Sequence, residues 1–187
     1  MRSKFKVVFV AFVLHFGFCG ISQGAEHFTK SSEKIVMSDG VKLATDIYLP
    51  AQGEKWPCIL MRSPYNKNNS KGDGEKFTKM GYAVVIQDTR GKFESEGKFY
   101  PFKHDRKDGL ATIDWIKSQK WFGGKIAGWG GSYVGYTQWA IADQLDAFVP
   151  VVTSANMYDL CYPSGIFSLA TAFNWGLAVD SKTVNKS

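Results

Sequence analysis

The sequence predicts an α/β fold in which a doubly wound, mostly parallel sheet is covered by helices on both faces. Three observations predict it. Short, continuous apolar runs alternate along the chain with segments of helical periodicity. An N-terminal antiparallel hairpin precedes the first of these runs, and a glycine-rich turn leads from the third run directly into a helix. Such alternation is typical of parallel strands joined by crossover helices.

The N-terminal hairpin is predicted from the residues on either side of Asp39-Gly40, a pair that favours a two-residue turn. One arm is expected at 33–38 and the other at 41–49. Apolar and polar side chains alternate in the second arm, so we expect a half-buried strand with one face in the core. Pro50 ends that strand.

The parallel part of the sheet is predicted from four apolar runs, because strands covered on both faces lack alternation. These runs lie at 57–61, 82–86, 125–129 and 147–152, and helices are predicted at 75–80, 105–119 and 133–142. Polar loops are expected at 66–74 and 92–101. Asp88 and Arg90, after the second run, are interpreted as partners that fix loops. The sequence after Ser154 is rich in aromatics and has no clear periodicity.

Residues 1–24 are predicted to be a signal peptide. Arg2, Lys4 and Lys6 provide a basic start, 7–18 is almost wholly apolar, and small residues precede the expected cleavage after Gly24. We therefore expect an exported protein, periplasmic or secreted. The apolar core is too short for a comfortable membrane span, so no stable span is expected after cleavage. A retained anchor and an N-terminal helix of the domain are the alternatives.

The charge pattern indicates no macromolecular partner. The formal charge of +6 falls to +3 without the three cations of the signal peptide, and the other lysines are mixed with carboxylates. Because no basic stripe carries interleaved aromatics, nucleic-acid binding is not favoured.

Neither metal-ligand spacing nor a phosphate-binding loop is present, so no cofactor and no metal are expected. Cys58 and Cys161 are interpreted as packing residues or a disulfide, and the oligomeric state is left open.

Ser132 is the strongest candidate for chemistry. It lies in Gly130-Gly131-Ser132-Tyr133-Val134-Gly135, directly after an apolar run and before a helix. α/β-Hydrolases place their nucleophile on such a strand-to-helix turn, which exposes the hydroxyl and directs the next backbone N–H to the same place. The pattern differs from G-x-S-x-G because Val134 occupies the position of the second glycine. An ordinary loop with a helix-capping serine is the alternative.

Seven motifs occur in order between residues 34 and 175. They are Asp39-Gly40-Val41-Lys42-Leu43, Arg62-Ser63-Pro64-Tyr65, Gly81-Tyr82-Ala83-Val84, Asp88-Thr89-Arg90-Gly91, Ser95-Glu96-Gly97, Asp108-Gly109 and the Ser132 motif. With them the chain resembles the N-terminal portion of the cocaine esterase / Xaa-Pro dipeptidyl-peptidase-like (CocE/NonD, peptidase S15-type) hydrolases. In that family the turn reads G-x-S-Y-x-G. The resemblance implies an α/β-hydrolase domain over 25–155 and an incomplete helical cap over 156–187.

The resemblance implies a serine hydrolase of esters or amides that acts through an acyl-enzyme. Ser132 corresponds to the nucleophile, the backbone N–H of Tyr133 to one oxyanion donor, and the hydroxyl of Tyr65 to the second. A phenol suits this role because it is a strong donor on a rigid side chain. Without the resemblance, Tyr65 would be interpreted as a surface aromatic. Small esters, amides or short peptides are the expected substrates, and Trp175 or Phe173 are expected to line the acyl pocket.

No histidine follows Ser132 in this sequence. In the family, the triad acid and histidine come after the cap, whereas His27 and His104 precede Ser132, and no motif identifies an aspartate as the triad acid. We therefore expect a fragment truncated before the final strands, with little activity alone because an unassisted serine is a poor nucleophile. An exported Xaa-Pro dipeptidyl-peptidase-like hydrolase and a non-catalytic binding module are the alternatives.

Overall fold

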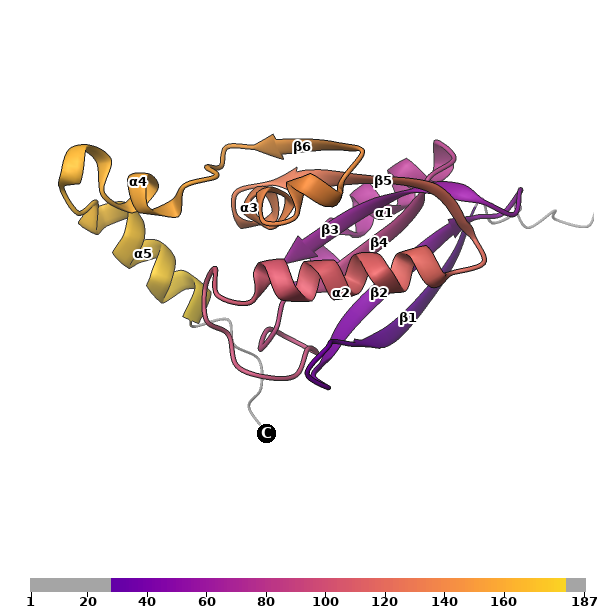
Figure 1. Ribbon diagram of the computed structural model, residues 1–187, viewed down its shortest axis with the longest axis horizontal. Helices are drawn as coiled ribbons and strands as arrows, with labels where there is room; N and C mark the ends of the chain where they lie inside the picture. Colours follow the sequence, from indigo (N-terminus) through magenta and orange to yellow (C-terminus); the bar gives the residue numbers. More distant parts are fainter. Residues whose placement is uncertain (1–27, 181–187) are drawn as a thin grey trace, which may run out of the picture.

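Six strands form one sheet in the computed structural model, which describes residues 28–180 (Figure 1). The predicted signal peptide lies outside the described residues. The strands lie in the order β1-β2-β4-β3-β5-β6. Their bounds are β1 (Phe28–Val36), β2 (Lys42–Pro50), β3 (Trp56–Ser63), β4 (Ala83–Asp88), β5 (Phe122–Gly131) and β6 (Ala147–Val151). Strands β3 to β6 are parallel and the β1–β2 hairpin joins β4 antiparallel, which confirms the doubly wound, mostly parallel sheet.

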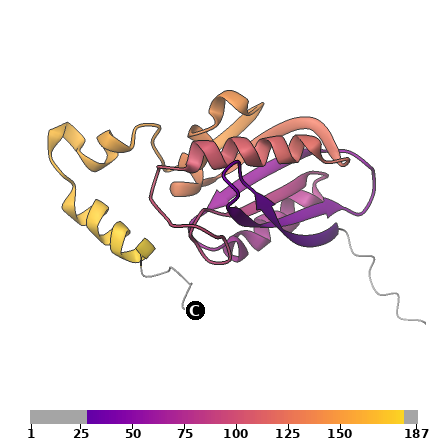
Figure 2. The ribbon, with the colours of Figure 1, turned by 60° about the horizontal axis from the view of Figure 1, so that its bottom comes forward.

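Helices cover both faces of the sheet, as predicted. The main ones are α1 (Lys71–Lys79), α2 (Asp105–Ser118) and α3 (Tyr133–Trp139), with α4 (Met157–Cys161) and α5 (Leu169–Asp180) beyond the last strand. Short 3₁₀ turns are η1 (Lys67–Ser70), η2 (Ala142–Gln144) and η3 (Pro163–Gly165). Figure 2 shows α4 and α5 standing apart from the sheet. None of the helices in residues 28–180 is both long and apolar enough to cross a membrane.

Two apolar clusters fill the space between the sheet and its helices. On one face, Ile113 and Ile116 of α2 pack against Leu60 and Val85 of the central strands. On the other face, Phe77 of α1 packs beside Ile86 and its neighbours. Alternate side chains of the same strands enter opposite clusters, as the two-residue period of a strand requires. The central strands are therefore covered on both faces, as their unbroken apolar runs predict.

The hairpin forms as predicted but differs in two details. Its loop has three residues, because Met37 donates to the carbonyl of Val41 and Gly40 donates to the carbonyl of Met37. Gly40 has a φ of 84°, the left-handed conformation that ends such a loop. The expectation that β2 is half-buried is wrong. Leu43 faces α2 and Tyr48 faces α1, so both faces of this strand are covered.

The helix predicted at 75–80 begins earlier, at Lys71, within the predicted polar loop. Gly72 and Gly74 concealed its first turns, since glycine is a poor helix former. Gly74 has a packing role, because a Cβ there would lie 3.0 Å from the ring of Tyr48. The helix after Ser132 is shorter than predicted and ends at Trp139. After Ser154, where no periodicity is evident, the chain forms α4 and α5.

The polar residues at the end of β4 and just after it hold loops, as predicted. The Asp88 carboxylate accepts a 2.6 Å hydrogen bond from the backbone N–H of Lys67. Arg90 forms a buried bidentate pair with Asp108 on α2 and also pairs with Asp39 of the hairpin loop. These contacts fix the segments on either side of the β4 terminus. Cys58 and Cys161 are both free thiols in this structure.

Candidate active site

Ser132 lies on a strained turn between β5 and α3. Its backbone has a φ of 54° and a ψ of −128°, a combination that a residue with a side chain rarely adopts. Hydrogen bonds hold this conformation on both sides: the Ser132 N–H donates to the carbonyl of Val151, and the Ser132 carbonyl accepts from Tyr136. The side chain is exposed at the end of the parallel strands. The sharp turn predicted from the sequence is therefore present.

The glycines before Ser132 allow α3 to pass close to β5. Gly130 has a φ of 134°, and a Cβ at this position would lie 2.4 Å from the Val134 side chain. A Cβ on Gly128 would lie 2.8 Å from Gln138, which is one turn beyond Val134 in α3. Since neither position has room for a side chain, the glycines permit the close packing of strand and helix that exposes the serine.

Tyr65 lies opposite Ser132, with its hydroxyl oxygen 3.1 Å from the Ser132 Oγ. The phenol follows β3, and β3 pairs directly with β5 in parallel, so the ends of both strands meet at one edge of the sheet. The backbone N–H of Tyr65 donates to the Ser63 hydroxyl, and Asn69 donates to the Tyr65 carbonyl. These bonds fix the loop that carries the phenol. The structure thus brings together two residues selected from separate motifs.

Tyr133 is the first residue of α3, so its backbone N–H has no partner within the helix. Its buried side chain is held at two points: the hydroxyl donates to Asp105 at 2.6 Å and accepts from the backbone N–H of Phe102 at 2.8 Å. Burial raises the pKa of both Tyr133 and Asp105, and the positive charge of Arg62 opposes that shift in each. The anchored phenol fixes the start of α3, including the N–H that follows Ser132.

Trp175 of α5 contributes a polar contact that the sequence did not predict. Its indole N–H donates to the Tyr65 hydroxyl at 3.0 Å, across 110 residues of sequence. Its ring is stacked on Phe102 and on Tyr133, with centroid distances of 5.7 and 5.8 Å. Trp175 was expected to line a pocket, and it does. Phe173, the other expected residue, is 56% exposed and does not line it.

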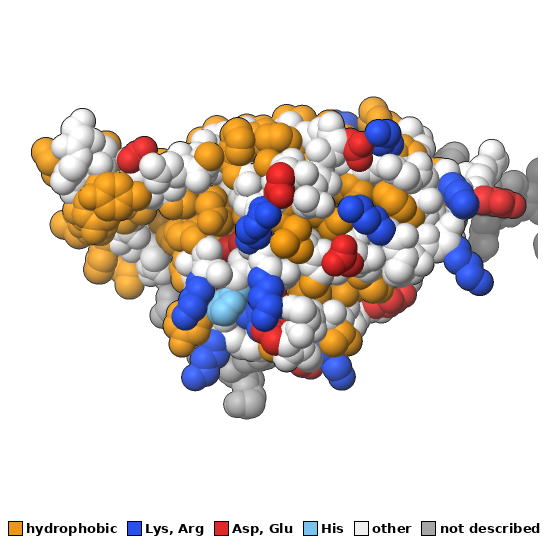
Figure 3. Space-filling view, viewed as in Figure 1, with side chains coloured by type: hydrophobic (Ala, Val, Ile, Leu, Met, Phe, Trp, Pro, Cys, Tyr) orange, Lys and Arg blue, Asp and Glu red, His pale blue; other side chains and the backbone are white. Residues whose placement is uncertain are grey.

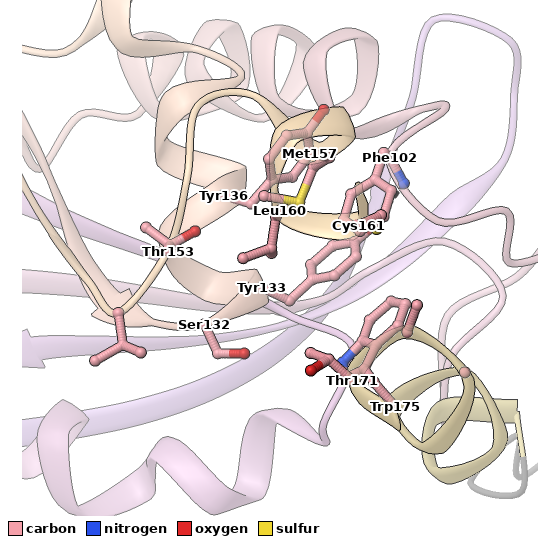
Figure 4. A pocket seen from close by; sticks show the side chains of 13 residues that line it. Phe102, Ser132, Tyr133, Tyr136, Thr153, Met157, Leu160, Cys161, Thr171 and Trp175 are labelled. Atoms are coloured by element: carbon pink, nitrogen blue, oxygen red, sulfur yellow. Dashed lines mark hydrogen bonds between the residues drawn. The ribbon is translucent and has the colours of Figure 1, made fainter. Parts of the chain in front are cut away.

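A cavity of about 340 Å³ opens beside the serine, between the end of the sheet and the α4–α5 segment. Figure 4 shows the Ser132 hydroxyl directed into it, with Tyr133 and Trp175 on the facing walls. Aromatic and aliphatic side chains form most of its lining, including Phe102, Tyr136, Met157 and Leu160. None of the described residues that line it carries a charge. The cavity therefore suits an uncharged, apolar group.

A family profile matches residues 39–187, that of the X-Pro dipeptidyl-peptidase (S15 family). The chain belongs to this S15 family. It is 37% identical over 161 residues to a cocaine esterase of Rhodococcus sp. (strain MB1 Bresler), a match that covers 80% of this chain and 28% of that protein. The chain thus spans little more than a quarter of the curated relative. The match confirms the family resemblance seen in the motifs.

Solved structures of other hydrolases share the fold. A CocE/NonD family hydrolase from Staphylococcus aureus aligns with a TM-score of 0.64 at 26% identity, over 71% of this chain and 29% of that one. An aminopeptidase from a marine sediment archaeon, Thaumarchaeota archaeon, aligns with a TM-score of 0.58 at 30% identity, over 68% and 26%. The sheet, the strained turn and these relatives together establish the α/β-hydrolase fold.

No described histidine is hydrogen-bonded to Ser132. His104 is the single histidine within residues 28–180, and it stands at the start of α2 with its ring against Tyr100. His27, which also precedes Ser132, lies outside the described residues. Two aspartates that follow Ser132 are engaged elsewhere, Asp143 with Arg106 and Asp146 with Lys125. Within the described part of the chain, no group of three or more His, Cys, Asp or Glu could hold a metal ion.

Proposed function

We propose that this chain carries the nucleophile and the oxyanion donors of a serine hydrolase that cleaves small esters or amides through an acyl-enzyme. The observation that carries the proposal is the 3.1 Å approach of the Tyr65 hydroxyl to Ser132 on a strained turn. The esterase name of the Rhodococcus relative supports the same chemistry. In this proposal, Ser132 is the nucleophile, and Tyr65 and the Tyr133 N–H are the donors.

Each proposed role follows from the position of the group. The Ser132 Oγ attacks the substrate carbonyl, and negative charge develops on the carbonyl oxygen. The Tyr65 hydroxyl and the Tyr133 N–H donate to that oxygen, while the alcohol or amine leaves and the acyl group stays on the serine. Water then releases the acid. Donors held by a rigid fold stabilise the developing charge without having to reorganise.

The proton of Ser132 requires a base, which we propose is supplied by polypeptide outside residues 28–180. Among the described residues, neither a histidine nor a carboxylate is hydrogen-bonded to the Ser132 hydroxyl. Oxyanion donors alone leave a small fraction of the catalysis of an intact triad. We therefore expect the 187-residue chain to hydrolyse p-nitrophenyl esters barely above background. Rapid turnover by this chain, lost in S132A, would contradict that expectation.

The cavity favours a neutral acyl group as the substrate portion bound beside Ser132. Its described lining is uncharged and largely aromatic, which suits apolar groups. The second candidate function is Xaa-Pro dipeptidyl-peptidase-like hydrolysis, as the family description suggests. A dipeptide with a free ammonium group would need a carboxylate at this site. The described lining offers none, so we place the peptidase second.

The nucleophile can be tested on the chain as it exists. The chain is treated with an excess of a fluorophosphonate probe at alkaline pH, and mass spectrometry locates the labelled serines. The rate of labelling at Ser132 is compared with the rate at Ser118, which is also exposed. We expect faster labelling at Ser132, because strain and the two donors raise its reactivity, and loss of that label in S132A. Equal labelling of the two serines would support the remaining alternative, a hydrolase-like binding module without catalysis.

We also propose that the protein is exported. The support is the sequence alone: a basic start, an apolar segment and small residues before position 25. Expression in a bacterial host followed by N-terminal sequencing tests this directly. We expect a mature chain that begins at Ala25 and is recovered outside the cytoplasm. An uncleaved chain in the cytoplasm would contradict the proposal.

A further inference from the structure

We propose that Trp175 is a positioning residue: its indole N–H orients the Tyr65 hydroxyl, so that docking of α5 completes the site at Ser132. This inference rests on the proposed function for its consequence, although its geometry stands independently. Three groups form a continuous hydrogen-bonded chain, from the indole Nε1 to the Tyr65 oxygen at 3.0 Å and from there to the Ser132 Oγ at 3.1 Å.

The direction of this chain follows from the donor capacity of each group. An indole N–H donates and cannot accept, so the Tyr65 oxygen is the acceptor from Trp175. With that acceptor site filled, the single phenolic proton is available on the side of Ser132. Hydrogen bonds in series also polarise one another, so a phenol that accepts from an indole is a stronger donor. Both effects favour Tyr65 as a donor toward an oxyanion.

The indole is held in place by rings that belong to the body of the domain. Phe102 and Tyr133 stack on Trp175 with interplanar angles of 16° and 12°. Tyr133 is itself fixed through its hydroxyl by Asp105, and Phe102 donates to that same hydroxyl. The direction of the indole N–H is therefore set by the anchored aromatic stack and not by α5 alone.

A second contact docks the same face of α5. Lys92, in the loop after β4, is fully buried and donates to the carbonyl of Val179. Residues 175 and 179 are one helical turn apart, so the indole and this carbonyl lie along one side of α5. Phe173 and Leu177, which lie two residues before and two residues after Trp175, are each 56% exposed. Figure 3 shows apolar side chains on the surface of this end of the molecule.

The bond itself can be observed in solution. The chain has six tryptophans, so a ¹⁵N-labelled sample gives a small set of indole N–H resonances, and W175F identifies the one from Trp175. In Y65F the aromatic ring at position 65 remains, but the hydroxyl oxygen that accepts from the Trp175 indole is lost. We expect the Trp175 resonance to move upfield in Y65F. The same resonance unchanged in Y65F would overturn the proposal whatever the reactivity of Ser132.

A double-mutant cycle tests the consequence at Ser132. The rate of fluorophosphonate labelling is measured in wild type, W175F, Y65F and the double variant, with F173L as a control on the exposed side of α5. W175F keeps an aromatic ring for stacking but lacks the N–H. We expect W175F to slow labelling about three- to tenfold, Y65F to slow it about tenfold or more, and F173L to have no effect.

The cycle separates orientation of Tyr65 from general packing. If Trp175 acts through the Tyr65 hydroxyl, then W175F has no further effect in the Y65F background. An equal slowing by W175F in both backgrounds overturns the proposal, as does an unchanged rate in W175F alone. If wild-type Ser132 is no more reactive than Ser118, the proposed function fails, and the indole resonance then decides the positioning proposal by itself.

Discussion

The hydroxyl oxygens of Tyr65 and Ser132 lie 3.1 Å apart, although 67 residues separate them in the chain. The sheet explains this proximity. Strands β3 and β5 are parallel neighbours, so the residues that follow them emerge at the same edge. Different local structures position the two residues: a strained turn exposes the serine, and loop hydrogen bonds hold the tyrosine. Substitutions in the two structures should therefore have separate, measurable effects on stability and on the reactivity of Ser132.

Strain at Ser132 predicts an unusual order of stability among its variants. Glycine tolerates the φ of 54°, whereas alanine keeps the Cβ that makes this conformation costly. We expect S132G to exceed S132A in unfolding free energy by about 1 kcal/mol in urea denaturation. At Ser118, in the last turn of α2, the order should reverse because glycine weakens helices. S132A as stable as S132G would show that the turn is unstrained.

Crowding at Gly130 predicts that a single methyl group disrupts the turn. A Cβ there would lie 2.4 Å from Val134 in addition to the unfavourable φ of 134°. We expect G130A to lower the unfolding free energy by about 2–4 kcal/mol. G72A is the matched control, because Gly72 lies in α1 with no atom within 4 Å of an added Cβ. It should stabilise the helix by about 0.5–1 kcal/mol. Similar effects of the two variants would contradict the packing.

Asp88 predicts a distinctive pH dependence of stability. Burial raises its pKa to about 7, against the opposing hydrogen bond from the Lys67 N–H. Between pH 4 and 7 the folded protein therefore holds a proton that the unfolded chain has released, so this contribution to stability is lost as the pH rises. D88N is neutral throughout. We expect its stability relative to wild type to increase by about 1–3 kcal/mol between pH 4 and pH 8.

The control for Asp88 is D114N, at an exposed position on α2. The change with pH should be larger for D88N than for D114N, because Asp88 is buried and Asp114 is exposed. Chemical denaturation at several pH values measures both differences, and the titrations common to all variants cancel. A D88N difference that stays flat or decreases with pH would contradict a proton held by Asp88.

Two bidentate arginine–aspartate pairs should differ in how much stability their removal costs, because one is buried and the other is exposed. Arg90 pairs with Asp108, which is 1% exposed, whereas Arg106 and Asp143 are both more than half exposed. We expect R90A to cost about 3–5 kcal/mol, since it leaves a buried carboxylate without its partner. R106A should change stability little, because water screens the exposed pair. Thermal denaturation of both variants measures the contrast, and equal losses would contradict it.

The strands, the helix α2 and the turn at Ser132 could be predicted because each has a strong local pattern. The burial of both faces of β2 could not, since it depends on α1 and α2 packing on opposite sides of that strand. The start of α1 was concealed by Gly72 and Gly74, and the need for Gly74 becomes evident only beside Tyr48. Tertiary packing decided each of these features.

At the site, Ser132 was identified from its own motif and Tyr65 from the family resemblance, and their proximity follows from the order of the strands. The bond from Trp175 to Tyr65 could not be predicted, because it joins residues 110 positions apart through a segment without periodicity. The contact between Tyr133 and Asp105 could not be predicted either, because it depends on how α3 packs against α2. An aromatic residue identifies an apolar surface from sequence alone, but the partner of its polar atom requires the fold.

The proposed roles of Ser132 and Tyr65 are tested most directly by the rate at which a fluorophosphonate labels Ser132 in wild type and in Y65F. We expect Ser132 to react faster than Ser118 in the wild-type chain. Loss of the Tyr65 hydroxyl should slow labelling of Ser132 about tenfold or more and leave Ser118 unaffected. Labelling of Ser132 that is no faster than that of Ser118, or that is unchanged in Y65F, would contradict these roles.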